Sequence, residues 1–198
     1  MNTKTLWLMA VVATCLITRS ALAATDGSIG HTSTGTADIT LTVDEVALIY
    51  GMEDFTLHYT GGISDVTGFK NVCVYTNDAG GGSVGNASDS TGLYKVTASG
   101  DGTGSAFTVA NDFVSDVIPY AVQWNDATGG AGTALLATTQ FASPFANARI
   151  TWASGGANGG CGADNASYTV TFTAEDILDH PAGNYTGTLT IVVAPDDT

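Results

Sequence analysis

The side chains best suited to acid–base chemistry in this chain are its three histidines, His31, His58 and His180. His31 lies in a segment rich in serine, threonine and glycine, His58 in a strand-like run, and His180 directly before a proline. No nucleophile motif or metal-ligand spacing accompanies any of them. A carboxylate pair for glycoside hydrolysis would be recognisable only by its geometry. We therefore expect no enzyme, no catalytic residue, and no metal or other cofactor.

Glycine-rich loops are the second place where chemistry could reside. They cover residues 78–82, 99–104 and 154–162. None of them opens a helix with a Lys-Ser/Thr pair, so none is a phosphate-binding loop. The run Asp101-Gly102-Thr103-Gly104 allows a calcium site, but it lacks the repeated acidic ligands and the closing glutamate of a calcium loop. A tight turn is the preferred interpretation.

The cysteines indicate a disulfide. Cys15 lies in an amino-terminal signal-like segment, which leaves Cys73 and Cys161 as one possible pair in an oxidising compartment. No histidine stands at ligand spacing from either cysteine, so a metal site is disfavoured. A disulfide closing so long a loop would contribute on the order of 4–5 kcal/mol in the chain-entropy model.

Residues 1–23 have the organisation of a secretory signal peptide. Lys4 supplies the charged start, the apolar run covers Leu6 to Ile17, and Ala21-Leu22-Ala23 is a small-x-small cleavage site. Arg19 interrupts the run, whereas a membrane anchor needs roughly 20 apolar residues. We expect an exported, soluble mature chain beginning near Ala24, with a membrane anchor as the alternative.

The charge of the chain excludes one class of partner. The whole chain carries 19 acidic residues and a formal net charge of −14. Removal of the predicted signal leaves only three cations, Lys70, Lys95 and Arg149. Nucleic-acid binding needs clustered cations that neutralise phosphates, so it is excluded. Solubility and mutual repulsion of exported molecules explain the acidity.

The elements that would position any functional side chains are predicted to be strands. The mature chain is rich in glycine and threonine, and short runs with a period of two recur between turn signals. Candidate strands cover residues 46–50, 55–59, 72–75, 93–98, 106–109, 118–124, 149–152 and 168–173. Only Ala174 to His180 predicts a helical turn, with two acids in its first turn. The pattern favours an all-β fold, an antiparallel β-sandwich of the immunoglobulin-like type.

Two stretches far apart in the chain show the clearest alternation, which is typical of a strand with one buried face. In the amino-terminal stretch the apolar positions are Ala37, Ile39, Leu41 and Val43. In the carboxyl-terminal stretch the inward positions are Tyr185, Gly187, Leu189, Ile191 and Val193. The break at Asp44-Glu45 is expected to switch the inward parity to Val46, Leu48 and Tyr50. We interpret the two stretches as partners in different copies of the molecule.

Three segments carry a resemblance to a known family. They are DITLTVDEVALI at 38–49, IPYAVQW at 118–124 and AGNYTG at 182–187. The chain resembles pilus subunits of the chaperone–usher pathway, most closely the alpha-class colonisation-factor pilins, and is related in pattern to spore-coat-U-like exported proteins. It departs from those pilins in having Asp44-Glu45 in place of Asp-Pro, in the Cys73/Cys161 pair, and in the tail from Ala24 to Gly35.

The resemblance implies a mechanism and a set of partners. A pilin domain is a sandwich that lacks its seventh strand, and its final strand borders an apolar groove. A periplasmic chaperone first fills that groove, and the amino-terminal extension of the next subunit then replaces the chaperone, a form of β-strand addition. An outer-membrane usher, a surface fimbria and a possible host receptor follow from the same resemblance. It implies a signal peptide (1–23), an extension with the donor strand (24–43) and a sandwich domain (44–198).

Other functions stay open at this stage. Thr36 to Val43 is also compatible with the first strand of a closed sandwich that needs no partner, because edge and closed strands share one pattern. The chain would then be a monomeric binding module for carbohydrate or calcium, for which an exposed Trp124 or Trp152 would argue. A coat-like exported protein is the third possibility.

Overall fold

The computed structural model describes residues 25–77, 91–111, 116–129, 132–137, 145–149 and 162–196. The predicted signal peptide, Cys161 and Trp152 lie outside these ranges. The chain divides into two units, Met1–Val43 and Asp44–Thr198. Among the described residues, no helix is both long enough and apolar enough to cross a membrane.

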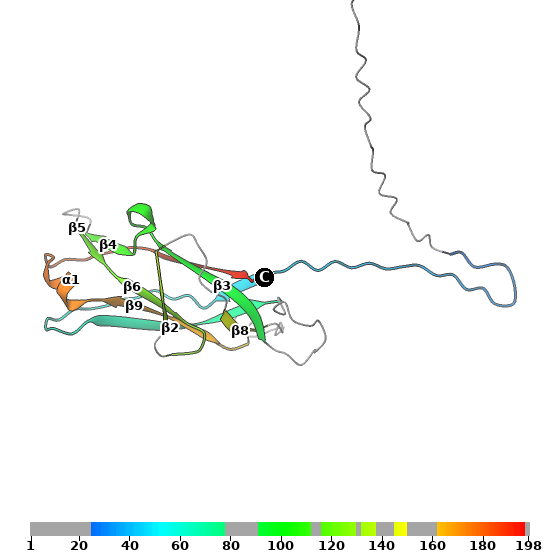
Figure 1. The fold of residues 1–198 in the computed structure, drawn as a ribbon, viewed down its shortest axis with the longest axis horizontal. Coiled ribbons are helices and arrows are strands. Elements are labelled where there is room, and N and C mark those ends of the chain that lie inside the picture. Colours follow the sequence, from blue (N-terminus) through cyan, green and yellow to red (C-terminus); the bar gives the residue numbers. More distant parts are fainter. Residues whose placement is uncertain are drawn as a thin grey trace, which may run out of the picture. The chain divides into compact units, whose positions relative to one another are not determined.

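Nearly all regular secondary structure of the second unit is strand (Figure 1). The strands and short helices, in chain order, are β1 (Ala47–Tyr50), β2 (Val66–Thr76), β3 (Thr91–Gly100), η1 (Thr103–Ser105), β4 (Thr108–Asn111), β5 (Asp116–Pro119), β6 (Ala121–Asn125), β7 (Thr133–Leu135), β8 (Phe145–Arg149), β9 (Ala166–Phe172), α1 (Ala174–Leu178) and β10 (Leu189–Pro195).

Strand β2 joins two groups of strands. Its first part, Val66–Val72, pairs with β9, which continues to β6 and β7. Its last part, Cys73–Thr76, pairs with β1, and Tyr75 pairs with Arg149 of β8, which continues to β3 and β10. β4 and β5 form a separate hairpin. Apart from the β2–β8 contact, these pairings are antiparallel, and the fold is the all-β, immunoglobulin-like sandwich predicted from the alternation.

Large aromatic side chains fill the core between the groups. Tyr94, Trp124 and Tyr168 are almost fully buried together with valines of β2 and β3. The Trp124 indole N–H donates to the Tyr94 hydroxyl (3.0 Å), which donates to Asp126 Oδ1 (2.6 Å). Burial and the bond to Asp126 raise the pKa of Tyr94. The buried polar atoms of this aromatic pair are therefore satisfied, as a stable core requires.

The single predicted helical turn is confirmed as α1. Thr173 is its N-cap, and its hydroxyl oxygen accepts a hydrogen bond from the Asp176 N–H (3.1 Å). Glu175 and Asp176 lie in the first turn, where negative charge is favourable. The Ala174 N–H donates to Asp65 Oδ1 (3.0 Å), which attaches this turn to the loop before β2.

The predicted strand from Ile118 to Trp124 is interrupted. β5 ends at Pro119 and β6 begins at Ala121, while the Tyr120 N–H donates to the Phe107 carbonyl (2.9 Å). Pro119 has no N–H to continue a ladder. At Tyr120 the chain therefore changes partners: β5 pairs with β4, whereas β6 pairs with β9. The uninterrupted alternation of the sequence did not predict this change.

The expected parity switch after Asp44-Glu45 is wrong. Ile49 packs against the core, whereas Val46 and Tyr50 are 50% and 41% exposed. The register agrees with this, because Ile49 lies opposite Val74, which belongs to the hydrophobic core cluster, and directly opposed residues share a face. Inward residues of β1 therefore have the same odd numbering as the apolar residues of the extension.

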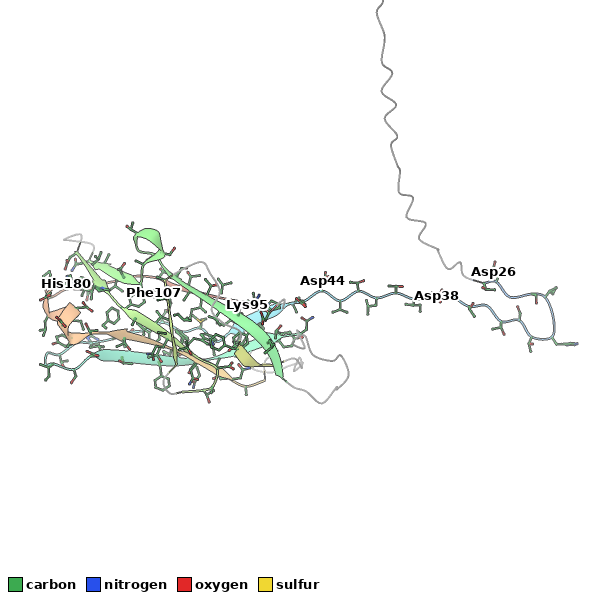
Figure 2. All side chains as sticks on the ribbon, in the orientation of Figure 1. Asp26, Asp38, Asp44, Lys95, Phe107 and His180 are labelled. Carbon is green, nitrogen blue, oxygen red and sulfur yellow. The ribbon has the colours of Figure 1, made fainter. Side chains whose placement is uncertain are left out.

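The described part of the first unit contains one short pairing. Thr25 and Thr36 exchange two backbone hydrogen bonds of 2.9 Å, which close a hairpin-like turn. The chain around Asp38 then runs extended (Figure 2). Ile39, Leu41 and Val43 are 94%, 83% and 71% exposed. This segment has the sequence of a half-buried strand but leaves most of its apolar face exposed.

Candidate functional site: an apolar groove at an open sheet edge

The second unit contains a large open groove of about 1150 Å³. One rim is the segment Met52–Tyr59, and the other runs from His180 to Leu189. The floor between them is formed by apolar and aromatic side chains of β2, β4, β5, β9 and α1 and of the β5–β6 junction, namely Val66, Val109, Ile118, Tyr120, Tyr168, Val170, Phe172, Ile177 and Leu178. A groove of this composition is suited to apolar side chains rather than to a charged ligand.

The first rim has the alternation of a strand without being one. Phe55, Leu57 and Tyr59 are half-buried, and the residues between them are exposed. The ring of Phe55 packs edge-on against Tyr168, with centroids 5.4 Å apart. A β-carbon on Gly68 would stand 2.8 Å from Phe55 Cδ1 and 2.9 Å from Leu57 Cδ2, so glycine is needed there to let the rim approach β2.

The backbone of this rim lacks a ladder. Both backbone polar groups of Glu53 bind the hydroxyl of Tyr168 instead. This hydroxyl accepts a hydrogen bond from the Glu53 N–H (3.2 Å) and donates one to the Glu53 carbonyl (2.8 Å). From Asp54 to His58, no backbone group has a hydrogen-bond partner within the described part of the chain. The predicted strand 55–59 is therefore not formed, because its alternating sequence has no neighbour to pair with. An unpaired row of this kind is a template for an added strand.

The second rim is paired along one edge only. Thr186 exchanges two backbone bonds with Ala110 (2.8 and 2.9 Å), and the Thr188 N–H donates to Asp101 Oδ2 (2.9 Å). Successive residues of an extended chain direct their polar groups to opposite edges. The backbone groups of Tyr185 and Gly187 therefore point away from Ala110, toward the groove. β10 continues this rim as an end strand, paired with β3 alone among the described strands.

A polar cluster lies beside the groove at His180, which is labelled in Figure 2. Asp116 Oδ2 lies 2.8 Å from His180 Nδ1 and accepts a hydrogen bond from the Tyr185 hydroxyl (2.9 Å). Desolvation raises the pKa of Asp116, but the bonds from His180 and Tyr185 outweigh it, so its pKa lies below the ordinary value. The cluster joins β5 to the second rim and holds Tyr185 in place.

The floor of the groove is partly desolvated around Tyr120. Desolvation raises the pKa of Tyr120 to about 12, and the charge of Asp101 adds to this. The ring of Tyr120 stacks on Phe107 and lies against Phe172, with centroid separations of 5.5 and 5.4 Å. A phenol in such surroundings remains neutral at physiological pH, so this part of the floor carries no charge.

The predicted site residues fall into three places. Tyr185, Gly187 and Leu189 line the groove, whereas Ile191 is buried in the core and Val193 packs against it. The regular strand begins only at Leu189, later than the alternation indicated. The predicted donor residues lie in the other unit, and Cys73 is fully buried in β2 while its predicted partner Cys161 is outside the described residues.

Sequence reasoning missed the first rim as part of the site. Phe55, Leu57 and Tyr59 were predicted to be a strand but were not assigned to the groove. The available signal was that this run follows the first strand after only four residues, the first of which is Gly51, whose φ of +89° favours glycine. After such a kink an extended segment can leave the sheet of the preceding strand and border an open groove elsewhere in the sandwich.

Within the described residues, neither calcium nor carbohydrate binding receives structural support. The described residues contain no group of three or more side chains that could hold a metal ion. Asp101 of the possible calcium loop accepts the Thr188 N–H, and Gly104 turns with a φ of +68°. Trp124 is fully buried, so it forms no exposed platform for a sugar.

Comparisons with known proteins give limited likenesses. No family model and no curated protein matches the sequence. One structural match is a chain from a chaperone–tip adhesin complex described as vital for CFA/I fimbriae biogenesis, with 16% identity, TM-score 0.44 and coverage of 76% of this chain and 43% of that one. Another is a chain from the CsuC–CsuE chaperone–tip adhesion subunit pre-assembly complex of archaic Csu pili of Acinetobacter baumannii, with 14% identity, TM-score 0.36 and coverage of 77% and 40%. The chain spans less than half the length of either match.

Proposed function

We propose that the protein is a structural subunit of an exported surface fimbria that polymerises by donor-strand exchange and takes part in adhesion. The observation that carries the proposal is the groove, which has an apolar floor and two rims with unpaired backbone edges. An extended strand placed there would hydrogen-bond to both rims and bury one face. The site therefore fits β-strand addition better than binding of a small molecule.

The occupant is the extension of another copy of the same chain. Its residues Ala37, Ile39, Leu41 and Val43 alternate with polar residues, and the three larger side chains are exposed in the extension itself. Seven extended residues span about 23 Å and the eight residues of Met52–Tyr59 about 26 Å, at roughly 3.3 Å per residue. The donor and the rim thus match in length as well as in periodicity.

The energetics favour such a complex. Burial of Ile39, Leu41 and Val43 would contribute roughly 5–9 kcal/mol at about 1.5–3 kcal/mol each. Backbone hydrogen bonds to both rims would add about 1 kcal/mol apiece. The extension cannot gain this stabilisation alone, because a single strand is not stable in water.

The remaining partners are those that the family resemblance implies, and the exposed groove gives each of them a role. A subunit exported with an open apolar edge is prone to aggregate until a strand fills it. A periplasmic chaperone that lends a strand, and an outer-membrane usher that exchanges it, would meet this need. We place the signal peptide at 1–23, the extension with the donor strand at 24–43 and the acceptor domain at 44–198, with the assembled fimbria on the cell surface.

A denaturing gel of exported protein without boiling tests the proposal. Strand-exchanged polymers should give a ladder that collapses to one band after boiling. A variant lacking residues 24–43, mixed with intact protein, should shorten the ladder because it accepts a strand but gives none. A single band of intact protein without boiling would instead favour a monomeric module.

A further inference from the structure

The sheet formed by β2, β9, β6 and β7 has an outward surface without charged side chains, and its strands β2, β9 and β6 lie side by side in Figure 1. Two rows of opposed residues cross this sheet, and the members of a row share a face. Val170 and Val122 alternate with these rows and are buried, so both rows point away from the core. The rows are Thr67, Thr171 and Ala121, and Phe69, Thr169, Gln123 and Ala134.

Large apolar side chains stand on the two outer strands of this surface. Phe69 of β2 is 58% exposed. On the other side, Leu135 of β7 is buried opposite Val122, so the next residue, Leu136, has the outward parity and is 78% exposed. Between these strands, the hydroxyl oxygens of Thr67 and Thr171 lie 3.1 Å apart and hydrogen-bond to each other. The two rows together with Leu136 form the uncharged face.

A loop limits the uncharged face at one end. Asn71 Oδ1 accepts a hydrogen bond from the Gly129 N–H (3.1 Å), and the buried Ser167 donates one to the Ala127 carbonyl (2.8 Å). The segment that follows β6 therefore covers the next row of the sheet. The uncharged face begins beyond this loop.

We propose that the uncharged face is a lateral contact surface, which packs on the same face of a copy in a neighbouring fimbria and joins fimbriae into bundles. This inference rests on the proposed function, because it requires the polymer. It adds a second kind of contact between copies, made outside the groove and without strand exchange.

Charge favours a second copy as the partner. The chain carries 19 acidic residues and a formal net charge of −14, so two copies repel each other wherever their acidic surfaces meet. The uncharged face allows two copies to approach without placing like charges together. A basic partner would instead select the acidic surfaces, where Coulomb attraction steers it.

The size of the uncharged face explains why the contact depends on the polymer. Four strands about 5 Å apart and two rows about 7 Å apart give a patch of roughly 300 Å². Two such patches bury roughly 600 Å² in total, well below the about 1,200 Å² at which stable interfaces begin. Single subunits should therefore not dimerise through it. A polymer repeats the face in every subunit, and many weak contacts between two polymers add up through multivalency.

The shape of the uncharged face suits contact with itself. A two-fold axis along the strands would place β2 of one copy over β7 of the other. Phe69 then meets the β7 edge, where the small Ala134 leaves room beside Leu136, and the same contact forms twice. The short side chains between these edges let the two sheets approach to about 10 Å, the usual spacing of stacked sheets.

Low-speed sedimentation of native wild-type polymer, checked by electron microscopy, tests the inference, because bundles pellet and single polymers do not. We expect bundles at about 0.15 M salt and few at about 0.01 M, because the Debye length grows from about 8 to about 30 Å and repulsion then reaches farther. In Phe69→Glu polymer at the higher salt, the bundled fraction should fall about tenfold or more, because each contact would bury an unpaired charge.

A matched control and a milder variant make the result specific. Val192 is also an exposed apolar residue of a strand, but it lies opposite Thr97 of β3, outside the uncharged face. Val192→Glu adds the same charge and should bundle like wild type. Phe69→Thr removes the apolar side chain without adding charge and keeps a residue suited to strands, so it should lower the bundled fraction by a smaller factor. If Phe69→Glu fails to fold, Phe69→Thr decides the question.

Gels of unboiled protein separate this inference from the proposed function. An intact wild-type ladder without bundles at either salt concentration would overturn the lateral contact and leave strand exchange intact. Equal loss of bundles in Phe69→Glu and Val192→Glu, or bundles that dissolve as salt rises, would also overturn it, because charge rather than the uncharged face would then control bundling. Wild-type protein without a ladder would refute the proposed function, and the lateral contact with it.

Discussion

At the residue scale, Asp116 links the second rim to β5. Its pKa is held below the ordinary value by hydrogen bonds from His180 and Tyr185, although desolvation opposes this. A carboxyl with a lowered folded-state pKa contributes stability above its unfolded pKa, near 3.9, and loses it as pH falls through the folded value. The contribution is therefore present at neutral pH and vanishes in strong acid.

The variant Asp116→Asn tests this assignment. We expect it to be less stable than wild type at pH 7, with the difference shrinking from about pH 4 downward, because the wild-type carboxylate then becomes protonated. Denaturant unfolding followed by tyrosine and tryptophan fluorescence between pH 2 and 7 measures the difference. A difference that stays constant over this range would show that the carboxylate charge has no part in holding the rim.

The extension offers a second test with a built-in control. Leu41→Asp would place a charge on the apolar floor of the acceptor, at a cost of several kcal/mol, so polymer should fall by roughly a hundredfold or more. Thr40→Asp adds the same charge on the opposite face and should leave most polymer intact. Quantitative gels of unboiled protein compare the amounts of polymer that the two variants form. An equal loss of polymer in both would contradict the assignment of Leu41 to the face that enters the groove.

At the element scale, the segment Met52–Tyr59 depends on the close approach that Gly68 permits. Gly68→Val would push Phe55 and Leu57 outward, because a β-carbon there stands under 3.0 Å from both side chains. We expect a displaced rim, weaker strand acceptance and less polymer. Thr67→Val, on the neighbouring position of β2, serves as the control, and similar polymer yields from both variants would refute this dependence.

The elements also show what the sequence reveals and what it does not. The strands around Val72–Tyr75, Leu93–Ala98 and Tyr168–Thr173 follow from local alternation, since their inward residues reach the core directly. The two rims of the groove do not follow from the sequence, because an alternating run has the same pattern whether or not a neighbouring strand exists. The sequence likewise could not show which residues of β1 face inward, since this depends on the register that places Ile49 opposite Val74.

At the scale of the whole molecule, the predicted link between Cys73 and Cys161 would attach β2 to a segment far away in the sequence. Thiol labelling of denatured, unreduced mature protein should then find no free cysteine. Mass spectrometry of the labelled chain gives the number of labelled cysteines. Two labelled thiols would refute the disulfide without affecting the groove.

The central claim is that a strand from one copy completes the sheet of another at the groove. Hydrogen exchange at the amides of residues 54–58, followed by mass spectrometry, measures this directly, because these backbone groups have no partner in the described part of the chain. In wild-type polymer, exchange should be slower by about tenfold or more than in polymerisation-deficient Leu41→Asp protein, since ladder bonds protect amides. Equally fast exchange in polymer and variant would contradict the account.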